Sequence, residues 1–313
     1  MNTLDSYPVF VDCYGDLATR FSADMSKIVP NLKVFYEEPA SEDVLIERLQ
    51  GRKNALVYMS YISSRVLKEC PDLKTISYLS TGLATHGDLD IAEEMGVRFE
   101  GVKGYGDRAV AEHAIALAFA AIKRLTEMDR AVRSGNWGLM KTEEIQSKTI
   151  GIIGLGGIGL ETAKISNALG ARTIGWSRSR PHTDIPIKLL TLNEVLSQSD
   201  IISLHLPLTK ETTGFIDSNA LKKTKPGLIL INTARAGIID ESALISYLSS
   251  GHIGHCALDV FHQEPVLMSN PLTKLENVTL TPHSAWLTTQ AIDRLLIAGL
   301  HLLKRHIAET ADV

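Results

Sequence analysis

The stretch "TIGIIGLGGIGLETA", residues 149–163, joins an apolar segment to a turn with regularly spaced glycines. The glycines of its G-x-G-x-x-G pattern are Gly154, Gly156 and Gly159. Between a strand and a helix, this pattern allows a tight turn, close approach of a pyrophosphate, and close helix–strand packing, in that order. We therefore predict a dinucleotide-binding unit whose N–H groups at Gly157 and Ile158 face the phosphates. A glycine turn that serves packing alone is the alternative.

The second strand of such a unit usually ends near an acidic residue, which accepts a hydrogen bond from the adenine ribose 2′-hydroxyl. After "ARTIGW" the chain instead has Ser177, Arg178, Ser179 and Arg180. Guanidinium groups bind phosphate in a bidentate manner, and a serine hydroxyl adds a donor without charge repulsion. We predict NADP as the cofactor. NAD remains possible if these arginines only belong to a solvated loop.

Composition narrows the class of protein. A chain of 313 residues suits two domains better than one core. Its 32 basic and 36 acidic residues give a net charge of −4, which provides no reason to expect a nucleic-acid partner or an anionic membrane. We see no secretory leader, and no apolar run long enough to span a bilayer. Three distant cysteines indicate reduced thiols in a cytoplasmic protein, and no metal site is expected.

Strand and helix patterns alternate along the chain, which predicts parallel βαβ units. The strands expected in the first part are "YPVFVD", "LKVFYE", "NALVYMS" and "LKTISYLS". Those expected later are "TIGIIG", "ARTIGW", "IISLHL", "GLILINTA", "GHCALDV" and "VTLTP". The predicted fold class is α/β, with two Rossmann-like or flavodoxin-like parallel-sheet domains and a cleft between them.

Two long helical segments suggest how the domains divide. "DRAVAEHAIALAFAAIKRL", residues 107–125, is apolar on nearly every side after His113, as a helix buried all round would be. The amphipathic segment 288–307 has no strand after it, so we expect it to return to the first domain. We therefore predict a discontinuous substrate-binding domain, 1–103 plus 286–313, and a dinucleotide-binding domain, 104–285.

Three ionisable residues follow predicted strands of the second half: Arg235, Glu264 and His283. Ligands of open α/β sheets bind outside the carboxyl ends of the strands, so these side chains should converge near the cofactor. An arginine can hold the carboxylate of a 2-oxo acid and polarise its carbonyl. A histidine can donate the proton that the resulting alkoxide needs. Glu264 would orient that imidazole and favour its charged form. Each residue alone also has an ordinary structural explanation.

The chain resembles the D-isomer-specific 2-hydroxyacid dehydrogenases over nearly its full length. The resemblance rests on five ordered blocks: "GIIGLGGIG", "LHLPLTKETTGFID", "INTARAGIIDESAL", "ALDVFHQEP" and "LTPHSAW". It implies that Arg235, Glu264 and His283 are catalytic, that Asp259 contacts the nicotinamide carboxamide, and that the protein is a homodimer built largely through its nucleotide-binding domains. The further residues that it places around the cofactor are Leu206, Pro207, Thr212, Thr233 and Ala234.

In the first half, "YLSTGLATHGDLDIAEEMGV" looks like the substrate loop of that family. The resemblance implies that backbone N–H groups near Gly82 and Leu83 bind the substrate carboxylate. The loop is one residue longer than the family pattern, with Ala84 and Thr85 at the point of departure. This difference affects the shape of the expected pocket.

The leading functional hypothesis is hydride transfer from NADPH to a small 2-oxo acid, similar to glyoxylate or hydroxypyruvate, to give a D-2-hydroxy acid. An NAD-dependent dehydrogenase of the D-lactate or phosphoglycerate type is one alternative. The other is a dinucleotide sensor, like the transcriptional corepressors that share this architecture.

Overall fold

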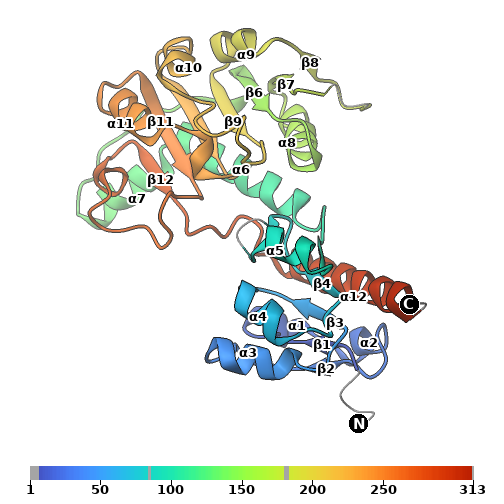
Figure 1. Cartoon of the computed structure of the whole chain (residues 1–313). Helices are drawn as coiled ribbons and strands as arrows, with labels where there is room; N and C mark the ends of the chain where they lie inside the picture. The colour runs from blue at the N-terminus through green and yellow to red at the C-terminus, as the bar shows by residue number, and fades with distance from the viewer. Residues whose placement is uncertain (1–6, 84–85, 180–182, 312–313) are drawn as a thin grey trace. The chain divides into compact units, whose positions relative to one another are not determined.

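The computed structural model describes residues 7–83, 86–179 and 183–311. The chain forms two compact units, Met1–Gly106 with Leu287–Val313, and Asp107–Trp286 (Figure 1). The sequence-based prediction had placed the borders at 103/104 and 285/286. None of the helices in the described part of the chain combines the length and apolar character that a membrane span requires.

The smaller unit is built on a parallel sheet of five strands in the order β2-β1-β3-β4-β5, which is the flavodoxin-like order. Its strands are β1 (Val9–Phe10), β2 (Lys33–Val34), β3 (Asn54–Val57), β4 (Thr75–Tyr78) and β5 (Arg98–Gly101). Its helices are α1 (Asp16–Arg20), α2 (Ala23–Ser26), α3 (Glu42–Leu49), α4 (Ser64–Glu69), α5 (Leu89–Glu94) and α12 (Thr289–Ala311). Ser41 caps α3, its side chain accepting a hydrogen bond from Val44 N.

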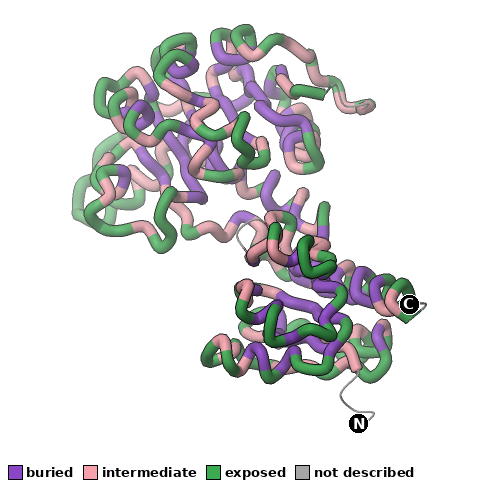
Figure 2. Tube along the Cα trace, in the orientation of Figure 1, coloured by how far each residue is buried: buried purple, intermediate pink, exposed green. Residues whose placement is uncertain are grey.

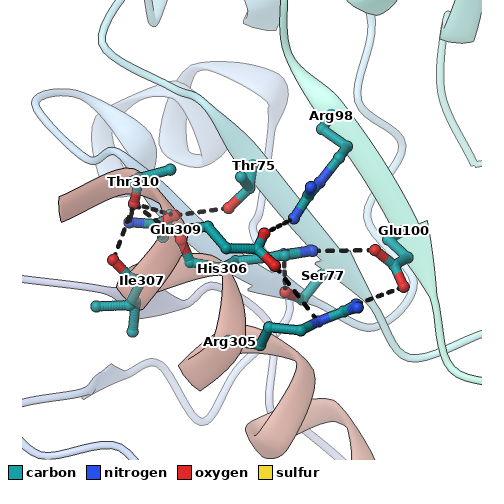
Figure 3. A network of polar contacts seen from close by, with 10 residues as sticks. Thr75, Ser77, Arg98, Glu100, Arg305, His306, Ile307, Glu309 and Thr310 are labelled. Atoms are coloured by element: carbon teal, nitrogen blue, oxygen red, sulfur yellow. Dashed lines mark hydrogen bonds and ion pairs between the residues drawn. The ribbon is translucent and has the colours of Figure 1, made fainter. Parts of the chain in front are cut away.

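The last helix, α12, packs on β3 and β4 of this unit and is held there by a polar network (Figure 3). The buried imidazole of His306 has its Nδ1 2.9 Å from Ser77 Oγ and its Nε2 3.2 Å from Glu100 Oε2. Arg305 donates to the other oxygen of Glu100 at 2.5 Å, and Arg98 pairs with Glu309. The C-terminal segment is therefore an integral part of the smaller unit.

The larger unit contains a parallel sheet of seven strands in the order β12-β11-β10-β9-β6-β7-β8. The strands are β6 (Thr149–Ile153), β7 (Arg172–Trp176), β8 (Lys188–Leu189), β9 (Ile201–Leu204), β10 (Leu228–Asn232), β11 (Ile253–Leu258) and β12 (Val278–Leu280). The helices are α6 (Asp107–Ile122), α7 (Leu125–Arg133), α8 (Gly157–Ala168), α9 (Leu192–Gln198), α10 (Ser218–Lys222) and α11 (Glu241–Ser249). Counted from β6, this is the Rossmann order 3-2-1-4-5-6 with one strand added.

The central strands β6 and β9 are buried along their whole length, and most of the other strands of this sheet are largely buried (Figure 2). Ile152 and Ile231 belong to a core cluster that includes residues of α6, whereas Ile202 and Leu230 belong to a second cluster with residues of α10 and α11. Successive side chains of a strand point to opposite faces, so an apolar run fills both clusters. The prediction of two parallel-sheet α/β domains is confirmed.

The strand β5 was not anticipated. It is an edge strand, and its sequence "RFEG" carries two charged residues. The structure explains them, because Arg98 and Glu100 both pair with residues of α12. Their partners lie more than 200 positions away, so no local pattern signals this strand.

Two histidines of the larger unit, the buried His255 and the half-buried His205, have lowered pKa values. Burial lowers the pKa of His255 to about 4 and that of His205 to about 3. The His255 Nε2 lies 2.8 Å from Thr279 Oγ1, and the His205 Nε2 lies 2.9 Å from Ser203 Oγ. Both imidazoles are therefore neutral in the folded protein at neutral pH.

This burial predicts acid sensitivity. Between pH about 6.5 and the lowered value, the unfolded chain binds a proton at His255 and the folded chain does not. The free energy of unfolding is thus complete above pH about 6.5 and falls by up to about 1.4 kcal/mol per pH unit toward pH 4. Replacing the imidazole with an amide, His255→Gln, should reduce this slope. Urea unfolding at pH 7, 6, 5 and 4.5 measures it, and equal slopes in both proteins would contradict the expectation.

Candidate active site

The first residues after six neighbouring strands of the larger sheet lie in one row. The registers pair the last residues of β7, β6, β9, β10, β11 and β12 with one another. The row that follows them is Ser177, Gly154, His205, Thr233, Asp259 and Thr281. Backbone bonds extend the ladder by this one position, including His205 N to Ile153 O at 2.8 Å. The strand order reverses at the neighbours β6 and β9, which is where nucleotides bind in open α/β sheets.

The three glycines of the turn have different structural reasons. Gly154 has a φ of +99°, and a Cβ there would lie 2.4 Å from the carbonyl oxygen of His205. A Cβ on Gly159 would lie 1.9 Å from the carbonyl oxygen of Gly154. Gly156 is the N-cap residue of α8, has a φ of −77°, and would bring a Cβ within 4 Å of no other atom. The fold therefore requires glycine at 154 and 159, whereas at 156 the space in front of the backbone is open.

A basic side chain follows the end of β7. Ser177 is half-buried, Arg178 and Ser179 are exposed, and Arg180 lies outside the described residues. The pKa of the Glu211 carboxyl is lowered chiefly by the hydroxyl of Thr209 and further by the charge of Arg178. The guanidinium of Arg178 thus lies within electrostatic reach of the loop that follows β9.

That loop contains three of the expected cofactor residues. Leu206 approaches the glycine turn, its Cδ2 3.1 Å from the position of a Cβ on Gly154. The Thr212 hydroxyl donates to Pro207 O at 2.6 Å and accepts from Thr209 N at 2.7 Å. This hydroxyl therefore shapes the loop that presents Leu206 and Pro207.

Arg235 is exposed and precedes a short 3₁₀ turn, Ala236–Ile238. The fully buried side chain of Asn232 fixes the backbone at Arg235. The Asn232 side chain donates to Arg235 O at 2.9 Å and accepts from Ala234 N at 3.0 Å. The arginine side chain is thus mounted on a fixed backbone at the carboxyl end of β10.

The expected imidazole–carboxylate pair is present. The Nδ1 of His283 lies 2.6 Å from Glu264 Oε2, and Phe261 N donates to Glu264 Oε1 at 2.8 Å. His283 has a φ of +51°, a left-handed conformation that is uncommon for residues other than glycine. Its side chain is 39% exposed. Because Nδ1 faces the carboxylate, Nε2 is the ring nitrogen left to exchange a proton.

Asp259 is fully buried, and its carboxylate is already bonded within the chain. Oδ1 accepts from Thr281 Oγ1 at 2.5 Å and from Ser284 N at 3.0 Å, while Oδ2 accepts from Ala285 N at 2.9 Å. The backbone oxygen of Asp259 also accepts from His283 N at 2.8 Å. Asp259 therefore organises the segment that carries the imidazole of His283.

The expected substrate loop lies in the smaller unit, after β4. Gly82 N donates to Ser80 Oγ at 3.3 Å, and Leu83 packs against the core of that unit. Ala84 and Thr85, where the loop departs from the family pattern, lie outside the described residues. A separate hollow of about 340 Å³ lies at the opposite, amino-terminal edge of β10 to β12, beside Gly227, Gly254 and Asn277. It includes none of the expected site residues.

The larger unit fits a dinucleotide. The open space at Gly156 admits a phosphate group against the start of α8. Thr233 is 7% exposed, and its hydroxyl has no hydrogen-bond partner among the residues that the structure describes. A buried polar group without a partner is costly, so a polar atom of a ligand at this edge would satisfy it.

Comparisons with known proteins agree with this geometry. Residues 115–285 match the model of the D-isomer specific 2-hydroxyacid dehydrogenase, NAD binding domain. A glyoxylate reductase of Thermofilum pendens is 36% identical over 82% of this chain and 79% of its own length. A D-3-phosphoglycerate dehydrogenase of Archaeoglobus fulgidus is 37% identical over 74% of this chain but only 44% of its own.

Among solved structures, an acyclic imino acid reductase (Bsp5) in complex with NADPH and D-Arg superimposes with a TM-score of 0.84. It is 29% identical, and the match covers 97% of this chain and 98% of that one. The fold and the site thus define a nucleotide-dependent oxidoreductase. The chain belongs to the D-isomer specific 2-hydroxyacid dehydrogenase family, and it is an NAD(P)-dependent dehydrogenase or reductase.

Sequence reasoning missed several supporting residues. Asn232 was read only as part of a strand. Asp107, the first residue of α6, reaches the glycine turn, where its Oδ2 would lie 1.9 Å from a Cβ on Gly157. His113 of the same helix bonds to Thr281. In the sequence, such a contact is indicated locally only by a polar residue inside an apolar run.

The glycine turn leads to a paired prediction. Gly156→Ala should leave the Tm within about 2 °C of the wild type, because the added methyl meets no protein atom, yet weaken dinucleotide binding at least about tenfold. Gly159→Ala should lower the Tm by several degrees, because the methyl meets a backbone oxygen. Thermal unfolding and fluorescence titration with NADPH measure both effects. Unchanged binding in Gly156→Ala would remove the turn as the phosphate site.

Proposed function

We propose that the protein transfers a hydride from NADPH to C2 of a small 2-oxo acid, similar to glyoxylate or hydroxypyruvate, and releases a D-2-hydroxy acid. The observation that carries this proposal is the 2.6 Å contact of His283 Nδ1 with Glu264. It lies in a segment that follows β12 at the carboxyl edge of a dinucleotide-binding sheet. Glyoxylate reductase, the name of the Thermofilum pendens relative, supports the substrate class.

In this mechanism the bound coenzyme supplies the hydride. The exposed guanidinium of Arg235 binds the substrate carboxylate through its planar fork and polarises the carbonyl. His283, oriented through Nδ1 by Glu264, donates a proton from Nε2 to the oxygen that becomes the hydroxyl. Glu264 is itself held by the Phe261 N–H, so the imidazole keeps one orientation.

The preference for NADP rests on Ser177 and Arg178. Ser177 continues β7 at the position where an NAD-binding unit usually has a carboxylate. Arg178 follows it with an exposed positive charge, suited to a ribose 2′-phosphate. The NADPH bound to the acyclic imino acid reductase is a related observation. Around the nicotinamide, we place Thr233 and Ala234. The carboxylate of Asp259, which was also expected there, is fully buried and bonded within the chain.

We further propose that two copies associate through their larger units, within the cytoplasm. Four apolar side chains of α7 and the segment after it are exposed by 50% or more: Leu125, Val132, Trp137 and Leu139. Such a concentration of exposed apolar groups is typical of an interface. The cysteines are all buried and free, as in a reducing compartment.

A panel of 2-oxo acids with NADPH and NADH tests the function, with His283→Ala as the diagnostic variant. We expect the wild type to reduce glyoxylate or hydroxypyruvate fastest. His283→Ala should lose at least about a hundredfold in kcat, because the proton donor is gone, and still bind coenzyme. Faster turnover of pyruvate or 3-phosphohydroxypyruvate would favour the alternative dehydrogenases. Coenzyme binding without turnover of any acid would favour the dinucleotide sensor.

The coenzyme preference has its own test, the double variant Ser177→Asp with Arg178→Ala. A carboxylate at 177 accepts from a 2′-hydroxyl and repels a 2′-phosphate. The ratio of kcat/KM for NADPH to that for NADH should therefore fall at least about tenfold. Lys188→Ala, in the neighbouring strand β8, is a control for the loss of a positive charge. An unchanged ratio in the double variant would refute the assignment of these residues to the 2′-phosphate.

A further inference from the structure

A chain of hydrogen bonds links the helix α6 to the buried carboxylate of Asp259. The Nε2 of His113, on α6, lies 3.0 Å from Thr281 Oγ1. Thr281 Oγ1 in turn lies 2.5 Å from Asp259 Oδ1. The His113 Nε2 is 3.6 Å from the same carboxylate oxygen. All three residues belong to the larger unit.

The chemistry of these groups sets the direction of the chain. Thr281 Oγ1 donates to Asp259 Oδ1, so the single hydroxyl proton of Thr281 is directed to the carboxylate. The hydroxyl oxygen can then act only as an acceptor toward His113, whose Nε2 must carry a proton. The direction is therefore from imidazole to hydroxyl to carboxylate.

The same carboxylate holds the segment that contains the candidate proton donor. Both of its oxygens accept backbone N–H groups, from Ser284 and Ala285. These two residues directly follow His283, whose φ of +51° requires support from its surroundings. The orientation of the Asp259 carboxylate thus sets the path of the backbone on which His283 is mounted.

Burial makes this arrangement demanding. The Asp259 side chain is 1% exposed, and that of His113 is 24% exposed. A buried carboxylate needs donors for its lone pairs, and the Thr281 hydroxyl is the only side-chain donor of a hydrogen bond to it within the described residues. Without this hydroxyl, a rotation of the carboxylate would carry residues 283–285 with it.

We infer that His113 and Thr281 are positioning residues of the active site, which fix the Asp259 carboxylate and through it the left-handed turn that presents His283. In this role both residues act through Asp259 and not on the reacting atoms. This inference rests on the proposed function for its kinetic consequence, but its structural consequence stands independently of turnover.

The test compares the same substitution, threonine to valine, at Thr279 in β12 and at Thr281 directly after it. Thr281→Val removes the relaying hydroxyl and keeps the side-chain shape. Thr279→Val, two residues earlier, removes a hydroxyl that is likewise bonded to a histidine, His255, and to Thr126, at 2.8 Å and 3.2 Å. Both changes delete a hydrogen-bonded hydroxyl close to an imidazole, so they are matched for loss of stability. Thr281→Ser and His113→Gln keep the donors, whereas His113→Leu does not.

Two measurements are made on each protein: amide hydrogen exchange of residues 281–287 without substrate, and kcat for the best 2-oxo acid. We expect Thr281→Val and His113→Leu to accelerate exchange at Ser284 and Ala285 and to lower kcat about tenfold, with a coenzyme Kd within about threefold of the wild type. Thr279→Val should change neither exchange nor kcat. Thr281→Ser and His113→Gln should restore both.

The outcomes separate the two proposals. If Thr281→Val behaves as Thr279→Val in exchange and in kcat, the positioning role is refuted. If Thr281→Val shows the expected changes in exchange and kcat but His113→Leu behaves as the wild type, the role of His113 is refuted. If no 2-oxo acid is turned over by the wild type while exchange still follows the expected pattern, the proposed function fails and the structural link stands.

Discussion

The parallel register of the larger sheet is the constraint on which the rest of the site depends. Six strands end at paired residues, so the next residue of each is delivered to one edge, although the stretch from Gly154 to Thr281 spans much of the unit. That edge receives the glycine turn, the buried hydroxyl of Thr233, and the carboxylate of Asp259. The backbone hydrogen bonds between the strands therefore place these residues next to one another.

Buried polar side chains hold the backbone at the two candidate catalytic residues, Arg235 and His283. Asn232 braces the backbone on both sides of Arg235, and Asp259 does the same for the segment of His283. Both side chains are fully buried, and both direct their bonding capacity to backbone groups of the following loop. Strand ends thus carry the exposed candidate groups on a fixed backbone, which limits their conformational freedom.

Both units contain buried polar side chains that bond to the backbone of a neighbouring loop. In the smaller unit, the buried carboxylate of Asp12 accepts from the N–H groups of Tyr58, Met59 and Ser60, which fixes the loop after β3. The polar network of α12 then closes the opposite end of the chain onto β4 and β5 (Figure 3). Each unit therefore has its own apolar core and its own internal polar support, as separately packed bodies require.

Much was determined by the sequence alone. Alternating apolar runs and helix patterns, the spaced glycines and the residues after each predicted strand were sufficient for the α/β class, the dinucleotide turn and the Arg235, Glu264 and His283 hypothesis, because these signals depend on local geometry. The strand β5, the brace at Asn232, the carboxylate of Asp107 beside the turn, and the link from His113 to Asp259 were decided by the tertiary structure. Each depends on residues far apart in the chain whose hydrogen bonds exist only after the sheet has assembled, and a linear pattern carries no record of such contacts.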